Sequence, residues 1–524
     1  MQNNNVDIVK VIVSKLKGKV KIELGQLGKA AITTSNGLHR DVFKAMVEAD
    51  EKTGIVALTG LDLGATLSVL YHTRTSNAFL TVKVEVPKED PKIQTIVDII
   101  PGAAFHELEV TDLFGVIFAG NENPGHFVLT DNWPMGVYPL RKDVNANAIK
   151  LNPSPPEEAA PPENGRLVKI IIGPQHPALL EPEKFAVTVD GETVVKVEPR
   201  IGYVHRGIEK AAESRTYLQD IYLVERICGI CTTIHACNFC ETVEKLLKTE
   251  VPQRGKYLRV LALELNRLHS HFLTLGHAGL EIGYETLFQY FWRDREPIMD
   301  LIELTSGNRV YPSIMTIGGV RRDLKDTDIP KIKSTMTDLR SKLPFYRQIY
   351  ANEPSLRARM KNVGVLKRED ALKLCVVGPV ARASGVDIDV RKDEPYEAYG
   401  EIPFNKVIYT DGDTWARMNV RMDEVEESIN IIEYVLDHMP TGPFRVKVPR
   451  AVPAGEAVNR VEAPRGELFC YIKSNGTALP ERVKVRTPTY ANIPAFLKTA
   501  IGENIADIPP NFVSLDPCFS CTDR

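Results

Sequence analysis

The stretch Arg226-Ile-Cys228-Gly-Ile-Cys231-Thr-Thr-Ile-His235 decides how the rest of the chain is interpreted. A second cysteine pair with the same spacing stands in Asp516-Pro-Cys518-Phe-Ser-Cys521-Thr-Asp-Arg524. Two intervening residues let both sulfurs of a pair point at one ion, so each pair is a natural chelate. Two such pairs that meet in space supply four thiolates, a set that suits zinc, nickel or iron.

Spacing alone leaves three kinds of site open. A structural zinc site with four cysteine ligands is one, iron–sulfur coordination is the second, and a nickel-containing centre is the third. Structural zinc sites usually draw their ligands from one local segment, whereas these pairs stand far apart in the chain. Cys237 and Cys240 form another pair, for which we expect a buried apolar role rather than a further cluster. The same role is expected for Cys375 and Cys470.

Composition places the chain among folded proteins. It has 524 residues, 43% of them hydrophobic and 25% charged, with a net charge of −3. These values exclude disorder over most of the chain and make nucleic acid a poor partner. No apolar stretch is long enough to predict a transmembrane helix, and the N-terminus does not resemble a secretory signal. We therefore expect a cytoplasmic protein or one that faces the cytoplasm.

Three segments are predicted along the chain: an α/β unit over residues 1–143, a proline-rich linker over 144–165 and a second domain over 166–524. Residues 41–52 have a helical pattern. Runs of apolar and β-branched residues predict three strands in the first unit. These strands are Ile55–Leu61, Phe79–Val86 and Ile93–Ile100.

The second domain changes character along its length. Asp190-Gly191 lies between alternating apolar and polar residues and predicts a hairpin turn. Leucines at three- and four-residue spacing predict a long helix over 255–275, and another is expected over Asp413–His438. Residues 442–489 are rich in strand and turn signals. The fold class predicted for the whole chain is α+β, with a mainly helical second domain that carries small β-sheets.

The two cysteine motifs together resemble those of the large, catalytic subunit of nickel–iron hydrogenases. Further matches are His205–Lys210 (HRGIEK) and Glu462–Gly466 (EAPRG). Gly173–Pro177 (GPQHP) is similar to the membrane-bound, energy-converting class, which is related to the quinone-site subunit of complex I. His106–Phe118 and Leu129–Asp143 resemble the small complex I subunit beside it. A fusion of the two resembles the formate hydrogenlyase large subunit.

This resemblance implies an oxidoreductase that interconverts dihydrogen with two protons and two electrons. Complex I subunits of this lineage have lost the four-cysteine set, and this chain has all four. The alternative is a non-catalytic scaffold or quinone-site subunit of a complex I-like assembly. The resemblance also implies that the protein lies peripherally on the cytoplasmic face of the cell membrane.

The resemblance implies a Ni–Fe centre whose iron carries cyanide and carbon monoxide. Cys228, Cys231, Cys518 and Cys521 would bind nickel, and Cys231 and Cys521 would also bridge to iron. Cys518 would be the thiolate that takes the proton. No iron–sulfur cluster is expected in this chain.

Other family positions fall on residues around the motifs. Glu181 matches the proton relay, and Arg465 matches the arginine over the open metal position. Thr489 and the backbone at Pro464 match partners of the cyanide ligands. We expect Asp516 to form an ion pair with Arg465. We expect His235, which closes the first cysteine motif, to belong to the proton network. From the residues alone, a solvated surface glutamate is the favoured explanation of Glu181. The corresponding alternatives are a surface ion pair for Arg465 and a turn residue before Pro517 for Asp516.

Glu209 matches a ligand of a structural magnesium ion in soluble relatives, in which the chain ends in histidine. Here Arg524 stands at that position, and a cation does not ligate a cation. An Arg524–Glu209 ion pair is the expected replacement. In this class a C-terminal peptide is removed three residues after the last cysteine, so the resemblance predicts a longer precursor cut after Arg524. The alternative is a gene that ends there.

The electrons released from dihydrogen need an exit, because the chain offers no convincing relay of its own. The resemblance implies a small subunit with a 4Fe-4S cluster and ferredoxin-like iron–sulfur subunits as partners. It further implies antiporter-like and quinone-channel-like membrane subunits. Formate dehydrogenase and ferredoxin are the electron partners to consider.

Overall fold

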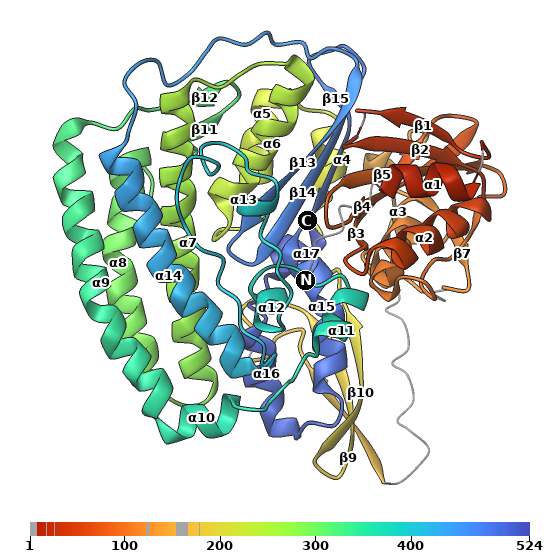
Figure 1. Cartoon of the computed structure of the whole chain (residues 1–524). Helices are drawn as coiled ribbons and strands as arrows, with labels where there is room; N and C mark the ends of the chain where they lie inside the picture. The colour runs from red at the N-terminus through yellow and green to blue at the C-terminus, as the bar shows by residue number, and fades with distance from the viewer. Residues whose placement is uncertain (1–7, 17, 26, 122–124, 154–165, 178) are drawn as a thin grey trace.

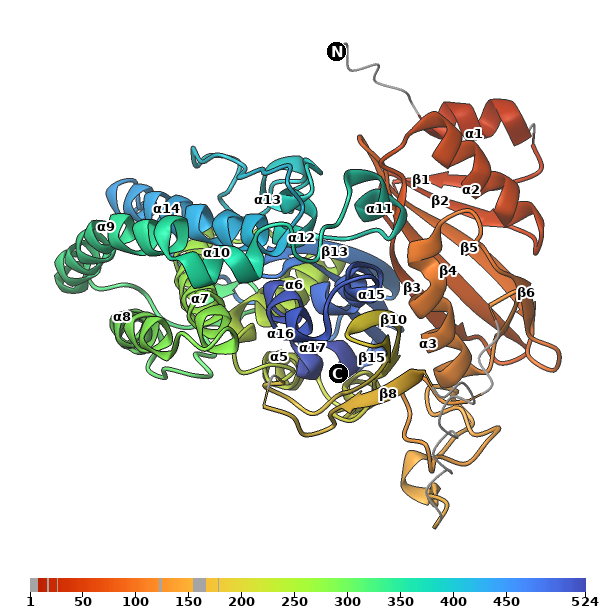
Figure 2. The same cartoon turned by 90° about the horizontal axis from the view of Figure 1, so that it is seen from below.

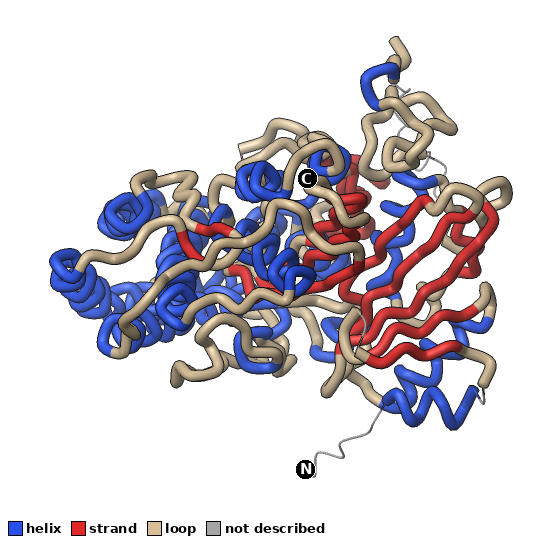
Figure 3. Tube along the Cα trace, turned by 90° about the horizontal axis from the view of Figure 1, so that it is seen from above, coloured by secondary structure: helices blue, strands red, loops and turns tan. Residues whose placement is uncertain are grey.

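The computed structural model describes residues 8–16, 18–25, 27–121, 125–153, 166–177 and 179–524. The predicted α+β class is confirmed: an N-terminal part rich in strands lies against a larger, mainly helical part (Figure 1). In Figure 3 most strands gather in one half of the molecule and the long helices in the other. Residues 154–165, most of the predicted linker, lie outside the described residues.

The N-terminal part is built on a five-stranded sheet with the order β1-β2-β5-β4-β3. Strands β2 and β5 are parallel, and the other neighbours are antiparallel. One face of the sheet packs against three helices through a shared apolar core. The strands are β1 (Lys21–Leu24), β2 (Ala30–Thr34), β3 (Gly54–Asp62), β4 (Thr66–Arg74) and β5 (Phe79–Pro87); the helices are α1 (Ile8–Leu16), α2 (Leu38–Ala49) and α3 (Ala104–Phe114).

The other face of this sheet packs against the helical part. Val56 and Phe79 share an apolar cluster with Phe469 and Tyr471 of the C-terminal sheet. Because both faces are covered, every residue of β3 is buried. This explains why β3 is a nearly continuous apolar run rather than an alternating one. Figure 2 shows β3 as the strand nearest to the helical part.

The predicted strands at Ile55–Leu61 and Phe79–Val86 are confirmed as β3 and β5. The helix predicted over 41–52 is present as α2, which begins three residues earlier and ends at Ala49. The strand predicted over Ile93–Ile100 is wrong beyond Gln94. Only β6 (Lys92–Gln94) forms, pairing with β7 (Ile117–Ala119). Glu107 ends the strand, because its carboxylate accepts from the Thr95 hydroxyl (2.6 Å) and from the Ile96 N–H (3.0 Å).

A three-stranded antiparallel sheet opens the helical part. It consists of β8 (Leu167–Ile172), β9 (Lys184–Asp190) and β10 (Thr193–Arg200). The predicted hairpin is confirmed, since Asp190 pairs with Thr193 across the turn. Gly191 adopts φ 63° there, a conformation that glycine reaches without steric cost.

Four long helices form the body of the second part: α7 (Gln253–Glu281), α8 (Glu285–Ser306), α9 (Ile329–Asn352) and α14 (Thr414–Asp437). The two predicted helices are confirmed as α7 and α14. The Asp413 side chain caps α14 by accepting from the Ala416 N–H (2.7 Å). Helix α7 contacts α8 on one side and α14 on the other, and it is buried along most of its length (Figure 1).

Shorter elements surround the long helices. The sheet predicted over 442–489 is confirmed, with the order β13-β14-β15. Within the described residues, no helix is long and apolar enough to cross a membrane. The remaining elements are α4 (Ile208–Ala212), α5 (Tyr217–Glu225), α6 (Thr232–Leu247), β11 (Met315–Thr316), β12 (Gly319–Val320), α10 (Pro354–Met360), α11 (Arg368–Lys373), α12 (Gly378–Ala383), α13 (Val390–Asp393), β13 (Gly455–Ala463), β14 (Gly466–Ser474), β15 (Pro480–Arg486), α15 (Pro488–Ala500), α16 (Ile508–Ser514) and α17 (Phe519–Asp523).

Candidate metal centre

The two cysteine pairs meet in the interior. Cys228 lies in the turn between α5 and α6, and Cys231 is the residue before α6. Cys518 precedes α17 and Cys521 lies within it. The sulfurs of Cys228 and Cys518 are 3.3 Å apart, although 290 positions separate them in the chain. The predicted convergence of the two motifs is therefore confirmed.

The four thiols form one buried group. The sulfurs of Cys228, Cys518 and Cys521 lie within 4.8 Å of one another. Cys231 joins them through its N–H, which donates to the Cys228 sulfur (3.3 Å). All eight cysteines are free thiols, and four of them are gathered here.

Hydrogen bonds to neighbouring backbone groups hold each cysteine motif in place. The Ile230 N–H also donates to the Cys228 sulfur (3.2 Å), so the first turn closes around that atom. At the second motif, the Cys518 N–H donates to the Thr489 hydroxyl (3.2 Å). The Thr522 hydroxyl donates to the Cys518 carbonyl (2.9 Å) and stabilises the turn of α17.

Hydrogen bonds between the thiols shift their pKa values in opposite directions. The pKa of Cys228 is lowered well below that of a free thiol because Cys231, Cys518 and Cys521 donate to it. The pKa of Cys231 is raised to about 12, first because its thiol donates to Cys228 and further because it is buried. A bound cation would favour deprotonation of all four thiols.

Arg465 lies directly on the thiol group. Its Nη1 donates to the Cys231 sulfur (3.0 Å) and to the Ser270 hydroxyl (3.3 Å). Its Nη2 donates to Asp516 Oδ1 (2.8 Å) and its Nε to the Asp516 carbonyl (2.8 Å). The predicted Arg465–Asp516 ion pair is therefore confirmed. Pro464 precedes the arginine in the tight connection between β13 and β14.

His235 and Glu181 lie beside the second cysteine motif. His235 Nε2 is 3.5 Å from the Cys521 sulfur, and burial lowers the pKa of His235 to about 4, so the ring is neutral. Glu181 is half-buried, and its carboxylate accepts from the Ser520 N–H (2.7 Å) and from the Ser520 hydroxyl. The pKa of Cys518 is raised, first by its hydrogen bond to Cys228 and also by the charge of Glu181.

Glu209 lies outside the thiol group among three cations. Arg482 Nη2 is 2.7 Å from its carboxylate, and Lys484 Nζ and Arg524 Nε are each 3.5 Å away. The expected Arg524–Glu209 pair is present, and these surroundings do not fit the magnesium ion that the resemblance implies. Sequence reasoning missed Glu109 of α3, which pairs with both Arg524 and Lys484.

Cys237, Cys240, Cys375 and Cys470 lie apart from the group and are buried. Burial raises the pKa of each of these thiols. Cys375 accepts a hydrogen bond from the Ile55 N–H (3.2 Å) and so contacts the N-terminal sheet. No further group of four cysteines forms among the described residues.

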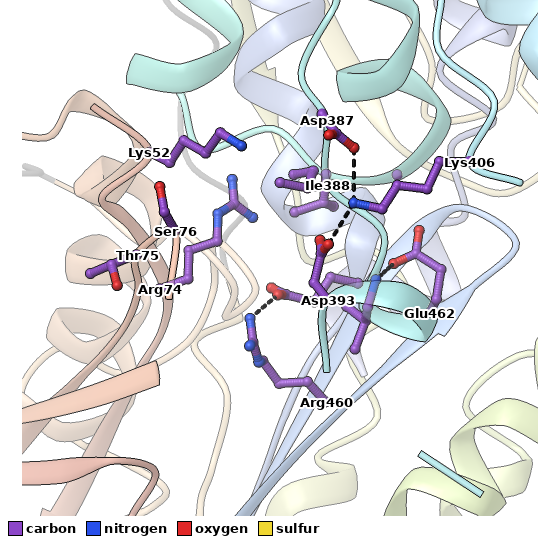
Figure 4. A pocket seen from close by; sticks show the side chains of 14 residues that line it. Lys52, Arg74, Thr75, Ser76, Asp387, Ile388, Asp393, Lys406, Arg460 and Glu462 are labelled. Atoms are coloured by element: carbon purple, nitrogen blue, oxygen red, sulfur yellow. Dashed lines mark hydrogen bonds and ion pairs between the residues drawn. The ribbon is translucent and has the colours of Figure 1, made fainter. Parts of the chain in front are cut away.

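A polar cavity of about 130 Å³ lies between the two parts of the chain and is lined by residues of both (Figure 4). Arg74 and Lys52 approach it from the N-terminal part, and Lys406 approaches from the opposite wall, where it bonds Asp387 and Asp393. Glu462 also lines the cavity, and burial raises its pKa to about 7. The thiols do not line this cavity, so it is a separate feature from the four-thiol group.

Comparisons with known proteins match the N-terminal part and the helical part of the chain to different families. Residues 32–150 match the family described as respiratory-chain NADH dehydrogenase, 30 Kd subunit. Residues 281–451 and 446–524 match the corresponding 49 Kd subunit, and residues 206–278 match nickel-dependent hydrogenase. A Bacteroides fragilis protein, the fused C/D subunit of NADH-quinone oxidoreductase, is 36% identical over 487 residues, which are 86% of this chain and 92% of that protein.

Two further relatives are named as hydrogenase-related subunits. The membrane-bound hydrogenase subunit alpha of Pyrococcus furiosus is 39% identical over 68% of this chain and 87% of its own length. Formate hydrogenlyase subunit 5 of Escherichia coli is 35% identical over 87% of this chain and 81% of its own. A chain of the membrane-bound sulfane sulfur reductase, an archaeal respiratory membrane complex, is 34% identical with a TM-score of 0.67, over 69% of this chain and all of that one.

The chain thus belongs to the family that unites the 49 kDa subunit of complex I with the large subunits of nickel-dependent hydrogenases. Within it, the chain is a fused form that joins a 30 kDa-like domain to the 49 kDa-like domain and carries the hydrogenase cysteine motif. It is a complex I-related, hydrogenase-like oxidoreductase subunit.

Proposed function

We propose that this chain is the catalytic subunit of a membrane-associated nickel–iron hydrogenase. The reaction is the reversible conversion of dihydrogen into two protons and two electrons. The observation that carries the proposal is the meeting of four buried thiols from both motifs beneath the guanidinium of Arg465. A scaffold protein has no need of such a group in its interior.

The donor set fits the implied metal group. Soft thiolates are the ligands that nickel and iron accept in a low-polarity interior. Cys228, Cys231, Cys518 and Cys521 would hold the nickel, and Cys231 and Cys521 would be shared with the iron. When bound, the Ni–Fe centre with its cyanide and carbon monoxide ligands supplies the redox chemistry.

The residues of the chain supply positioning and proton handling. Arg465 is held from two sides by Asp516 and Ser270, so its charge stays over the thiols without rearrangement. The Cys518 sulfur would receive a proton released from dihydrogen, while the electrons would pass to the bound centre. The Glu181 carboxylate, half-buried beside the helix that carries Cys521, passes the proton outward. The Thr489 hydroxyl, which contacts the Cys518 N–H, and the backbone at Pro464 would be the partners of the cyanide ligands.

Electrons leave through partner proteins. We propose a small subunit with a 4Fe-4S cluster, ferredoxin-like subunits beyond it, and antiporter-like and quinone-channel-like membrane subunits. This assembly would hold the chain at the cytoplasmic face of the cell membrane. The relatives named above as formate hydrogenlyase and membrane-bound hydrogenase subunits make formate dehydrogenase and ferredoxin the first donors to test.

A second candidate function is a non-catalytic subunit of a quinone-reducing complex. The relative matched over 92% of its own length is named NADH-quinone oxidoreductase, which favours this alternative. The two candidates differ in metal content and in their reaction with dihydrogen, because a scaffold needs neither.

The test is isotope exchange between D₂ and water on the purified complex, which follows bond cleavage without any electron partner. We expect HD to form with the wild-type chain and not with Cys521→Ser. Absence of exchange from a complex that contains nickel and iron would contradict the catalytic assignment. A Cys240→Ser variant provides the control, because that thiol is equally buried and lies outside the group.

A further inference from the structure

A second set of ligand atoms lies on α6, apart from the four thiols. Cys237 and Glu241 are four residues apart and so share one face of the helix. Glu397 approaches them from the segment between α13 and α14. One sulfur and two carboxylate oxygens, one atom from each residue, lie within 4.8 Å of one another. We propose that these three residues, the α6 site, bind a zinc ion that is independent of the nickel-binding thiols.

The charges around the α6 site leave room for a cation. Arg259 Nη1 lies 2.6 Å from Glu397, and Arg259 Nη2 lies 2.6 Å from Glu244. The one guanidinium of Arg259 therefore already forms ion pairs with two carboxylates. Among the described residues, Glu241 forms no ion pair and instead accepts from the Asn459 amide. The nearby Lys245 ammonium donates to the Val458 carbonyl (3.1 Å).

Buried carboxylates that outnumber their cations are costly unless a further positive charge joins them. The side chains of Glu241 and Glu397 are largely buried in the wall of a cavity, so water supplies only part of that compensation. A divalent ion between them would neutralise both carboxylates while Arg259 keeps its bond to Glu397. The same ion would hold the Glu397 segment against α6.

The donor atoms indicate which ion fits. Zinc takes thiolate, carboxylate and water in a tetrahedral arrangement, with ligand distances of about 2.0–2.3 Å. Magnesium and calcium prefer oxygen alone and would leave the sulfur of Cys237 unused. A cavity of about 500 Å³, lined by Glu241 and Glu397, gives an ion access and brings the water that completes four ligands.

The first experiment uses cobalt(II) as a spectroscopic probe for zinc in the full chain. Cys228, Cys231, Cys518 and Cys521 are all changed to serine, so that the nickel-binding thiols are absent. We expect one bound cobalt with a thiolate-to-cobalt charge-transfer band. Cys237→Ser should abolish the band, and Glu241→Gln should raise the dissociation constant at least tenfold. The matched control, Cys240→Ser, should change neither value.

A folded four-serine chain without the band, or a band that survives Cys237→Ser, would overturn the proposal. The second experiment covers the case in which the four-serine chain does not fold. Zinc is counted in the intact wild-type complex and in its Glu241→Gln variant, with one zinc ion fewer expected in the variant. Equal zinc content would overturn the proposal. Because nickel and hydrogen turnover are measured separately, failure here leaves the hydrogenase assignment untouched.

Discussion

The Arg465 guanidinium lies 3.0 Å from the Cys231 sulfur, and the same side chain is held by Asp516 on its other edge. This relationship joins three segments: the connection between β13 and β14, the turn before α6 and the residues before Cys518. A fully buried arginine at this point is tolerated because the Asp516 carboxylate balances its charge and the Cys231 sulfur accepts a further hydrogen bond from it. The guanidinium thus connects the two cysteine motifs.

Replacement of Arg465 by lysine should slow hydrogen turnover while the metals remain bound. Lysine keeps the charge but loses the planar fork that reaches Cys231 and Asp516 together. The loss of one preorganised donor predicts a decrease of roughly 10²-fold. Hydrogen oxidation rates per nickel measure the effect, with Arg460→Lys on the preceding strand, β13, as control. Wild-type rates in Arg465→Lys would remove the guanidinium from the mechanism.

Replacement of Cys231 or Cys521 by serine should abolish nickel and iron binding together. Each is proposed to touch both metals, so a single change weakens both. Elemental analysis of the purified complex measures this effect. Cys240→Ser should retain both metals at a cost of about 1 kcal/mol in stability. A Cys231→Ser protein with full nickel content would contradict the bridging role.

Glu181→Gln should retain the metals and slow the D₂–water exchange by roughly 10²–10⁴-fold, because the amide has the same shape but does not carry the proton. The amide oxygen still accepts from the Ser520 N–H, so the fold around α17 is kept. Exposed Glu198 on β10 provides the control, as Glu198→Gln. Unchanged exchange in Glu181→Gln would require another proton route.

The contact between the two parts of the chain should weaken in acid through His72. Its Nδ1 donates to the Thr81 hydroxyl, whose own hydrogen goes to the Leu27 carbonyl, and its Nε2 accepts from Thr59. The ring lies 4.6 Å from Phe469 of the C-terminal sheet. Burial lowers the pKa of His72 to about 3, so the folded protein holds it neutral.

Because the folded pKa of His72 is lowered, its contribution to stability is complete above the unfolded pKa of about 6.5 and declines as pH falls towards 3. The expected loss is about 1.4 kcal/mol per pH unit in that window. His72→Gln should make the free energy of unfolding less dependent on pH. Chemical denaturation between pH 7 and 4 measures this, with exposed His438→Gln as control. Parallel curves for wild type and His72→Gln would contradict the assignment.

Sequence patterns predicted the parts of the fold that depend on local periodicity. The apolar stripe of α7 and the Asp190-Gly191 turn are examples, because each is specified within a few residues. The strand over Ile93–Ile100 was wrong, since its apolar pattern does not reveal the Glu107 carboxylate that ends β6 at Gln94.

At the four-thiol group, too, the sequence predicted the local features and missed the contacts between distant segments. The cysteine spacing predicted the thiol group, and the resemblance predicted the Arg465–Asp516 pair. Neither indicated that Glu109 of the N-terminal part would meet Arg524, 415 positions away. The anchor of Glu181 on Ser520 was likewise not foreseen. Such contacts depend on how distant segments pack, which no local pattern encodes.

The infrared spectrum of the purified complex tests the central claim most directly. Iron-bound carbon monoxide and cyanide absorb in a region where protein groups do not, so their bands report the Ni–Fe centre itself. We predict one carbon monoxide band and two cyanide bands from the wild-type complex, lost in Cys521→Ser. A spectrum without these bands, from a complex saturated with nickel and iron during expression, would contradict the assignment as a nickel–iron hydrogenase.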